Sequence, residues 1–67
     1  MNINLLKSRR VLLGLSQERM AELLEVSQQN YCEKENNKKE FRLHEIVQLK
    51  RLLGLTSDEI NQIFMEG

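Results

Sequence analysis

Apolar residues recur at helical spacing along the whole chain, and no segment shows the alternation of apolar and polar residues that predicts a strand. The pattern predicts five helices, which cover residues 3–13, 17–24, 28–36 and 43–53 and a last segment that holds Ile60, Ile63 and Phe64. We therefore expect a compact all-α fold of five helices.

The same spacing predicts which side chains face the core. We expect every one of the first four helices to contribute: Leu6 and Leu13, then Met20, Ala21 and Leu24, then Tyr31, and then Ile46, Val47 and Leu49. The core is mainly aliphatic, and Tyr31 anchors the short third helix to it.

Two helix joints share one pattern, "LLGLS" at residues 12–16 and "LLGLT" at residues 52–56. In each joint the glycine suits the left-handed position after a helix, and Ser16 or Thr56 can cap the next helix. The second joint also fits a capping box, because Glu59 follows Thr56 by three residues. The flanking segments differ, so the joint is reused and the chain has no internal repeat.

Length and composition exclude several classes of protein. A chain of 67 residues can bury only one small core, which predicts a single domain over residues 1–67. One cysteine, Cys32, and one histidine, His44, cannot form an internal disulfide or an ordinary metal site, and we expect them to be a small filler and a surface residue. No nucleophile and base can be paired, so we expect no enzyme, no cofactor and no small-molecule ligand.

Apolar runs along the chain are short. None approaches the roughly 18 residues of a membrane span, and residues 1–14 lack the apolar segment of a secretory signal. We expect a soluble protein of the cytoplasm with no membrane partner.

The formal net charge is zero, but the charges are unevenly distributed. Residues 1–15 and 34–51 each carry an excess of three positive charges, whereas residues 16–33 and 52–67 each carry an excess of three negative charges. A chain that is neutral as a whole can therefore still present one basic face.

The second and third predicted helices are separated only by Glu25, Val26 and Ser27. So short a turn forces a sharp crossing, as in a helix-turn-helix, where the second helix enters the DNA major groove with its N-terminal residues toward the bases. Ser27 would cap that helix, and Gln28 and Gln29 would project forward from its first turn. Glutamine suits this role because its amide can pair with N6 and N7 of adenine.

The segment "LKSRRVLLGLSQERMAELLEVSQQNYCEKENNKK" resembles the phage-repressor-like helix-turn-helix proteins of the Cro and lambda-repressor type, and the resemblance extends over about residues 6–64. It implies binding to double-stranded DNA. The base-reading residues that it implies are Gln28, Gln29 and Asn30, and the contacts to the DNA backbone are Gln17, Ser27, Lys38, Lys39 and Arg42. It also implies a structural ion pair between Arg10 and Glu35, with a phosphate contact by Arg10 as the alternative or in addition.

Three residues depart from the family pattern. Glu25 occupies a turn position where relatives usually carry glycine, so either a strained left-handed backbone is tolerated, at about 1–2 kcal/mol, or the turn has another shape. Asn37 replaces a glycine after the recognition helix and suits the same left-handed conformation. Lys34 stands where relatives often have an apolar residue, and we expect its stem to cover apolar surface while its ammonium stays in water.

These observations predict a sequence-specific transcriptional regulator, by family analogy a repressor, that binds a palindromic operator as a homodimer. The alternative is a helix-turn-helix fold used as a protein-interaction module, antitoxin-like or regulator-binding. Leu5 and Leu12 form a second apolar stripe on the first helix, which could meet a partner, pack within the chain or dock residues 64–65. Salt distinguishes the two functions, because DNA binding weakens steeply as salt rises.

Overall fold

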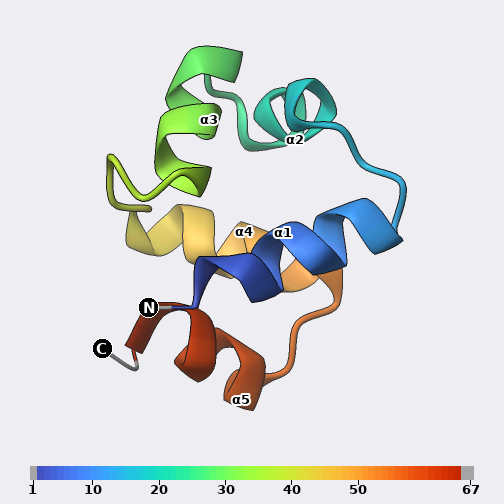
Figure 1. The fold of residues 1–67 in the computed structure, drawn as a ribbon, viewed down its shortest axis with the longest axis vertical. Coiled ribbons are helices and arrows are strands. Elements are labelled where there is room, and N and C mark those ends of the chain that lie inside the picture. The colour runs from blue at the N-terminus through green and yellow to red at the C-terminus, as the bar shows by residue number, and fades with distance from the viewer. Residues whose placement is uncertain (1, 66–67) are drawn as a thin grey trace.

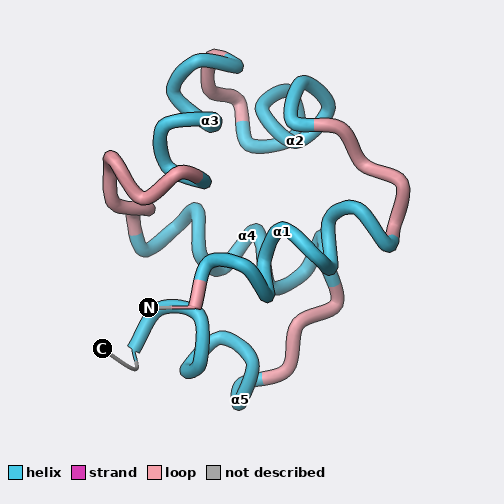
Figure 2. The backbone as a smooth tube through the Cα atoms, viewed as in Figure 1, coloured by secondary structure: helices cyan, strands magenta, loops and turns pink. Residues whose placement is uncertain are grey.

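The computed structural model describes residues 2–65. Within this range all regular secondary structure is helical and there is no strand, as predicted. The elements are α1 (Ile3–Leu12), α2 (Gln17–Leu24), α3 (Gln28–Glu35), α4 (Leu43–Leu53), α5 (Ser57–Ile60) and a π-helical segment, η1 (Asn61–Met65). α2 and α3 pack together at one end of the molecule, α1 and α4 cross its middle, and α5 lies at the other end (Figures 1 and 2).

The predicted fifth helix is present but divided. Thr56 caps α5 through its hydroxyl, which accepts a hydrogen bond from the N–H of Glu59 at 3.1 Å, and the Glu59 carboxylate accepts one from the N–H of Thr56 at 2.9 Å. This confirms the predicted capping box. After one turn the helix widens into η1, which keeps Ile63 buried and Phe64 against the core.

Both predicted glycine joints have left-handed backbone, with φ of 72° at Gly14 and 63° at Gly54. At the first joint the N–H of Leu15 bonds to the carbonyl of Arg10 at 3.0 Å, and that of Gly14 bonds to the carbonyl of Val11 at 2.9 Å. These are the two hydrogen bonds of a Schellman motif, which satisfies carbonyls that the helix end would otherwise leave free.

The core contains most of the residues that the spacing predicts, and the exceptions have a geometric reason. Val47 is 47% exposed, so the prediction that it faces inward is wrong. The buried stripe of α4 runs through Glu45, Leu49 and Leu53, four residues apart, which leaves Val47 on the other side of the helix. Leu13 is also exposed, because α1 ends at Leu12 and the turn carries Leu13 away from the face of Leu6.

The second stripe on α1 is divided in the same way. Leu5 is half-buried and packs against the core, whereas Leu12 is 78% exposed. The start of α1 also meets η1, since the N–H of Asn2 lies 3.3 Å and 3.2 Å from the carbonyls of Gln62 and Ile63. Intramolecular packing therefore accounts for Leu5 but not for Leu12.

The turn between α2 and α3 depends on Glu25, which has φ of 59° and ψ of 41°. The left-handed alternative is therefore the one that the chain adopts. In return, the N–H of Val26 bonds to the carbonyl of Ala21 at 3.0 Å, and this fixes the path of the chain into α3. A glutamate in this conformation is strained by about 1–2 kcal/mol, because its Cβ crowds the backbone.

We predict that Glu25→Gly stabilises the domain by about 0.5–1 kcal/mol, since relief of this strain exceeds the backbone entropy that glycine adds to the unfolded chain. Thermal unfolding measures the change. Glu22→Gly is the matched control, because Glu22 is exposed within α2, where glycine should cost about 1 kcal/mol. A lower melting temperature for Glu25→Gly would contradict the account of the turn.

Candidate nucleic-acid interface

The first turn of α3 presents three carboxamides in a row. Ser27 caps the helix through its Oγ, which accepts a hydrogen bond from the N–H of Asn30 at 3.1 Å. Gln28 and Gln29 are exposed, and neither side-chain amide is hydrogen-bonded to another residue within 2–65; Asn30 is half-buried. The structure thus leaves two amides free to meet a partner and holds the third closer to the protein.

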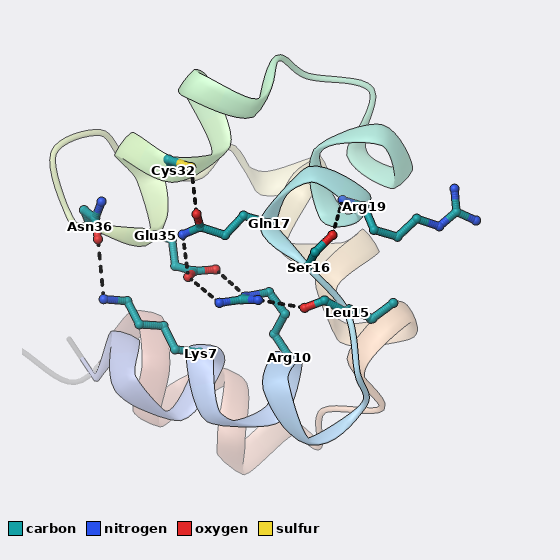
Figure 3. Close-up of polar contacts among 9 residues, drawn as sticks. All are labelled: Lys7, Arg10, Leu15, Ser16, Gln17, Arg19, Cys32, Glu35 and Asn36. Carbon is teal, nitrogen blue, oxygen red and sulfur yellow. Dashed lines mark hydrogen bonds and ion pairs between the residues drawn. The ribbon is translucent and has the colours of Figure 1, made fainter.

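A partly buried network, centred on the buried carboxylate of Glu35, holds α3 against the rest of the domain (Figure 3). Arg10 on α1 forms two hydrogen bonds to the Glu35 carboxylate, from Nε at 2.9 Å and from Nη2 at 3.1 Å, and a third to the carbonyl of Leu15 at 2.7 Å. The Glu35 side chain is only 1% exposed. The expected ion pair is therefore present, and with the bond to Leu15 it joins α1, the turn before α2 and the end of α3.

Gln17 belongs to the same network. Its Nε2 donates to Glu35 Oε1 at 3.1 Å, and its Oε1 accepts from the Cys32 thiol at 3.0 Å (Figure 3). Both polar atoms of this amide are thus engaged inside the protein, unlike those of Gln28 and Gln29. Gln17 is the first residue of α2, so its backbone N–H belongs to the first turn of the helix, where N–H groups have no helical partner.

The segment between α3 and α4 carries the cations that the sequence indicates. Lys38, Lys39 and Arg42 are all exposed, and the Lys39 ammonium lies 3.4 Å from the carboxylate of Glu33. Asn37 has the predicted left-handed backbone, with φ of 64°, and the N–H of Lys38 bonds back to the carbonyl of Glu33 at 2.8 Å. The exposed basic side chains therefore follow shortly after the end of α3.

Lys34 does not behave as expected. Its ammonium lies 2.7 Å and 2.6 Å from the two carboxylate oxygens of Glu45, and the two side chains are only 6% and 2% exposed. The prediction that this ammonium stays in water is wrong, because Glu45 provides a buried counter-charge at the start of α4. Cys32 and His44, for which the sequence predicts no functional role, lie as expected: Cys32 is half-buried and His44 is exposed.

A comparison with models of protein families shows the family to which the chain belongs. The model described as helix-turn-helix matches residues 6–60, which is most of the chain. The chain belongs to this family, the Cro and lambda-repressor type. No curated protein and no solved structure matches the chain. Membership places the chain among the DNA-binding helix-turn-helix regulators, a class that is typically not enzymatic.

No group of histidine, cysteine, aspartate and glutamate side chains in residues 2–65 could hold a metal ion. No helix in the same range is long and apolar enough to cross a membrane.

Two contacts of this chain lie outside what the family resemblance implies. The bond from Cys32 to Gln17 had no signal in the sequence. The bridge from Lys34 to Glu45 had a weak one, since Glu45 stands three residues after Arg42, the spacing at which a glutamate returns to cap its own helix. That spacing indicates where the carboxylate points but not that a lysine from α3 reaches it.

Two buried carboxylates of this helix-turn-helix domain have pKa values below the usual range. Burial opposes ionisation of Glu35, but the neighbouring Tyr31 hydroxyl and the hydrogen bonds from Arg10 and Gln17 outweigh it and lower the pKa. Burial likewise opposes ionisation of Glu45, and the Arg42 N–H and the Lys34 ammonium lower its pKa. Burial, together with the neighbouring Glu35 carboxylate, raises the pKa of the Tyr31 hydroxyl well above its usual value.

We therefore predict that acid destabilises the domain. A carboxylate with a lowered pKa in the folded state contributes stability above its unfolded pKa, near 4.5, and this contribution is lost as the pH falls through the folded value. Urea unfolding at pH 7 and at several pH values below 4.5 measures the loss. In the variant Glu45→Gln, the free energy of unfolding should fall less as the pH is lowered, because one of the two carboxylates is absent. A free energy of unfolding that stays constant down to pH 3 would contradict the ionised state of these two groups.

Proposed function

We propose that this chain is a sequence-specific DNA-binding regulator of transcription, a repressor that acts in the cytoplasm, and that residues 1–67 form its DNA-binding domain. One observation carries the proposal. Gln28 and Gln29 stand exposed and unpartnered on the leading turn of α3, while the buried contacts of Arg10 with Glu35 hold that helix in place. Side chains that read base edges need this combination of free polar ends and a rigid base.

The roles divide by position on α3 and its flanks. Gln28 and Gln29 would pair with base edges in the major groove, and Asn30 would contribute from the rim. Ser27, Lys38, Lys39 and Arg42 would contact phosphates and set the register of the protein on the duplex. Gln17 would meet a phosphate through its backbone N–H at the start of α2, because its side chain is engaged by Glu35 and Cys32.

The operator would be palindromic, with one copy of the chain on each half-site. Recognition helices in successive major grooves on one side of the duplex lie about 34 Å apart. The domain measures 26 × 23 × 19 Å along its principal axes, so two copies side by side can span this distance. A homodimer on DNA is therefore compatible with the size of the fold.

One observation favours the second candidate, a protein-interaction module. Three consecutive apolar residues at the end of α1 are exposed, Val11, Leu12 and Leu13. An exposed apolar cluster of this kind is typical of a surface that meets another protein. A regulator can also carry such a surface, so the cluster adds a candidate function and does not displace DNA binding.

Selection of binding sites from random duplex DNA, at two salt concentrations, tests the proposed function. We expect an enriched motif with two-fold symmetry and half-sites about 10 base pairs apart, bound less tightly as salt rises. The salt dependence comes from ions released when the cations of residues 38–42 contact phosphates. A selection without any enriched motif would favour the interaction module instead.

A further inference from the structure

The bridge between Lys34 and Glu45 lies where the base-reading helix meets the start of α4. Lys34 is on the same face of α3 as Asn30, one turn further along. Its ammonium contacts both carboxylate oxygens of Glu45, at 2.7 Å and 2.6 Å, and both side chains are buried. An ion pair so short and so well enclosed fixes the distance between the two helices at this point.

Glu45 has a second contact, which extends the bridge to the segment between the helices. Its Oε1 also accepts a hydrogen bond from the backbone N–H of Arg42 at 2.7 Å. Arg42 is the last residue of the segment 36–42, which carries the exposed cations. The same carboxylate therefore holds the end of this segment and the side chain of Lys34.

The other end of the segment 36–42 is also held by α3. The N–H of Asn37 bonds to the carbonyl of Lys34 at 3.1 Å, and the N–H of Lys38 bonds to that of Glu33 at 2.8 Å. Both ends of the segment 36–42 are thus linked to Lys34, the first end through its backbone carbonyl and the second through Glu45. Asn30, Lys39 and Arg42 line one hollow of about 580 Å³ together with the bridge.

An apolar pair could fill the same volume. Replacing a buried ion pair with apolar residues often preserves or raises stability, so stability alone does not account for the bridge. An apolar pair would allow the helices to slide, whereas two charges held by hydrogen bonds fix direction as well as distance. Direction matters when one element must reach bases and its neighbour must reach phosphates.

We propose that Lys34 and Glu45 are positioning residues for DNA binding, which set where the cations of residues 38–42 stand relative to the reading turn of α3. The inference rests on the proposed function. Without the bridge, the phosphate contacts and the base contacts no longer fit the duplex together, although α3 itself keeps its sequence preference.

The test is the double variant Lys34→Met with Glu45→Gln, which keeps the net charge and nearly the volume of the pair. On the motif selected by the unmodified chain, we expect the folded double variant to prefer the same bases but to bind about tenfold more weakly. The plot of log affinity against log salt should be shallower by about one, the equivalent of one lost phosphate contact. Affinities are corrected for the folded fraction, so a purely structural role would leave both quantities unchanged.

The matched control is Lys50→Gln with Asp58→Asn, which removes an exposed charge of each sign near the other end of α4. It should bind like the unmodified chain. If the double variant does not fold, the variant Glu45→Asp tests the inference in its place, because it keeps the charge but withdraws the carboxylate from Lys34. Its plot of log affinity against log salt should also be shallower than that of the unmodified chain. A variant plot that is as steep as that of the unmodified chain would overturn the inference alone, whereas an unmodified chain that selects no motif would overturn the proposed function and the inference with it.

Discussion

Replacing Arg10 with methionine is expected to lower the free energy of unfolding by about 3–5 kcal/mol. The guanidinium makes two hydrogen bonds to Glu35 and one to the carbonyl of Leu15, and its loss leaves a buried carboxylate with only Gln17 and Tyr31 beside it. A domain of this size has a total stability of roughly 3–10 kcal/mol. The variant should therefore lose a large part of this stability and unfold at a clearly lower temperature, as circular dichroism during thermal unfolding can show.

Arg19→Met is the matched control for this prediction. Arg19 is 57% exposed and lies 4.0 Å from Glu22 on the same helix, so its loss should change the stability by no more than about 0.5 kcal/mol. A difference between the two variants of less than about 1 kcal/mol would show that the network around Glu35 does not hold the domain together.

Gln28→Ala should lose about 1–3 kcal/mol of discrimination at one base position of each half-site while leaving the fold and the salt dependence unchanged. The cause is the loss of a bidentate amide from an exposed position, where no internal contact depends on it. Site selection with the variant, compared with that of the unmodified chain, measures the change position by position.

Gln62→Ala provides the control, because Gln62 is an exposed glutamine on η1, at the far end of the molecule from α3. It should select the same motif as the unmodified chain. If Gln28→Ala keeps the affinity and the base preference of the unmodified chain, Gln28 is not a reading residue.

Local signals in the sequence predicted most of the fold. The glycines at 14 and 54, the capping residues Ser16 and Thr56 and the three-residue turn before α3 each act over a few residues, and the structure has all of them. Helix ends were predicted to within one residue for α1 to α4. These features depend on backbone geometry that neighbouring residues determine, so they can be read without knowledge of the tertiary contacts.

The features that could not be predicted depend on residues far apart in the sequence. The apolar spacing predicts that Val47 faces inward, whereas Glu45 occupies the inward stripe of α4 and is neutralised by Lys34 from another helix. The spacing of apolar residues does not indicate that Glu45 is buried, because the lysine that neutralises it, Lys34, is 11 positions away in the sequence. The engagement of Gln17 by Cys32 and Glu35 has the same cause.

The candidate site divides in a similar way. The exposure of Gln28 and Gln29 follows from the cap at Ser27, a local feature, and could be predicted. The orientation of the Gln17 side chain depends on Glu35, 18 positions away, and could not. Conversely, the ion pair of Arg10 with Glu35 came from a family resemblance, which records long-range contacts that spacing alone does not.

On the proposed function, the leading turn of α3 and the segment that follows this helix meet DNA. Amide NMR spectra, recorded while the isotopically labelled chain is titrated with its selected duplex, show which residues do so. We predict that the largest shifts fall on residues 27–30 and 37–42 and that Val11, Leu12 and Leu13 keep their positions. Shifts confined to Val11–Leu13, with residues 27–30 unchanged, would contradict the claim and assign the interaction surface to the end of α1.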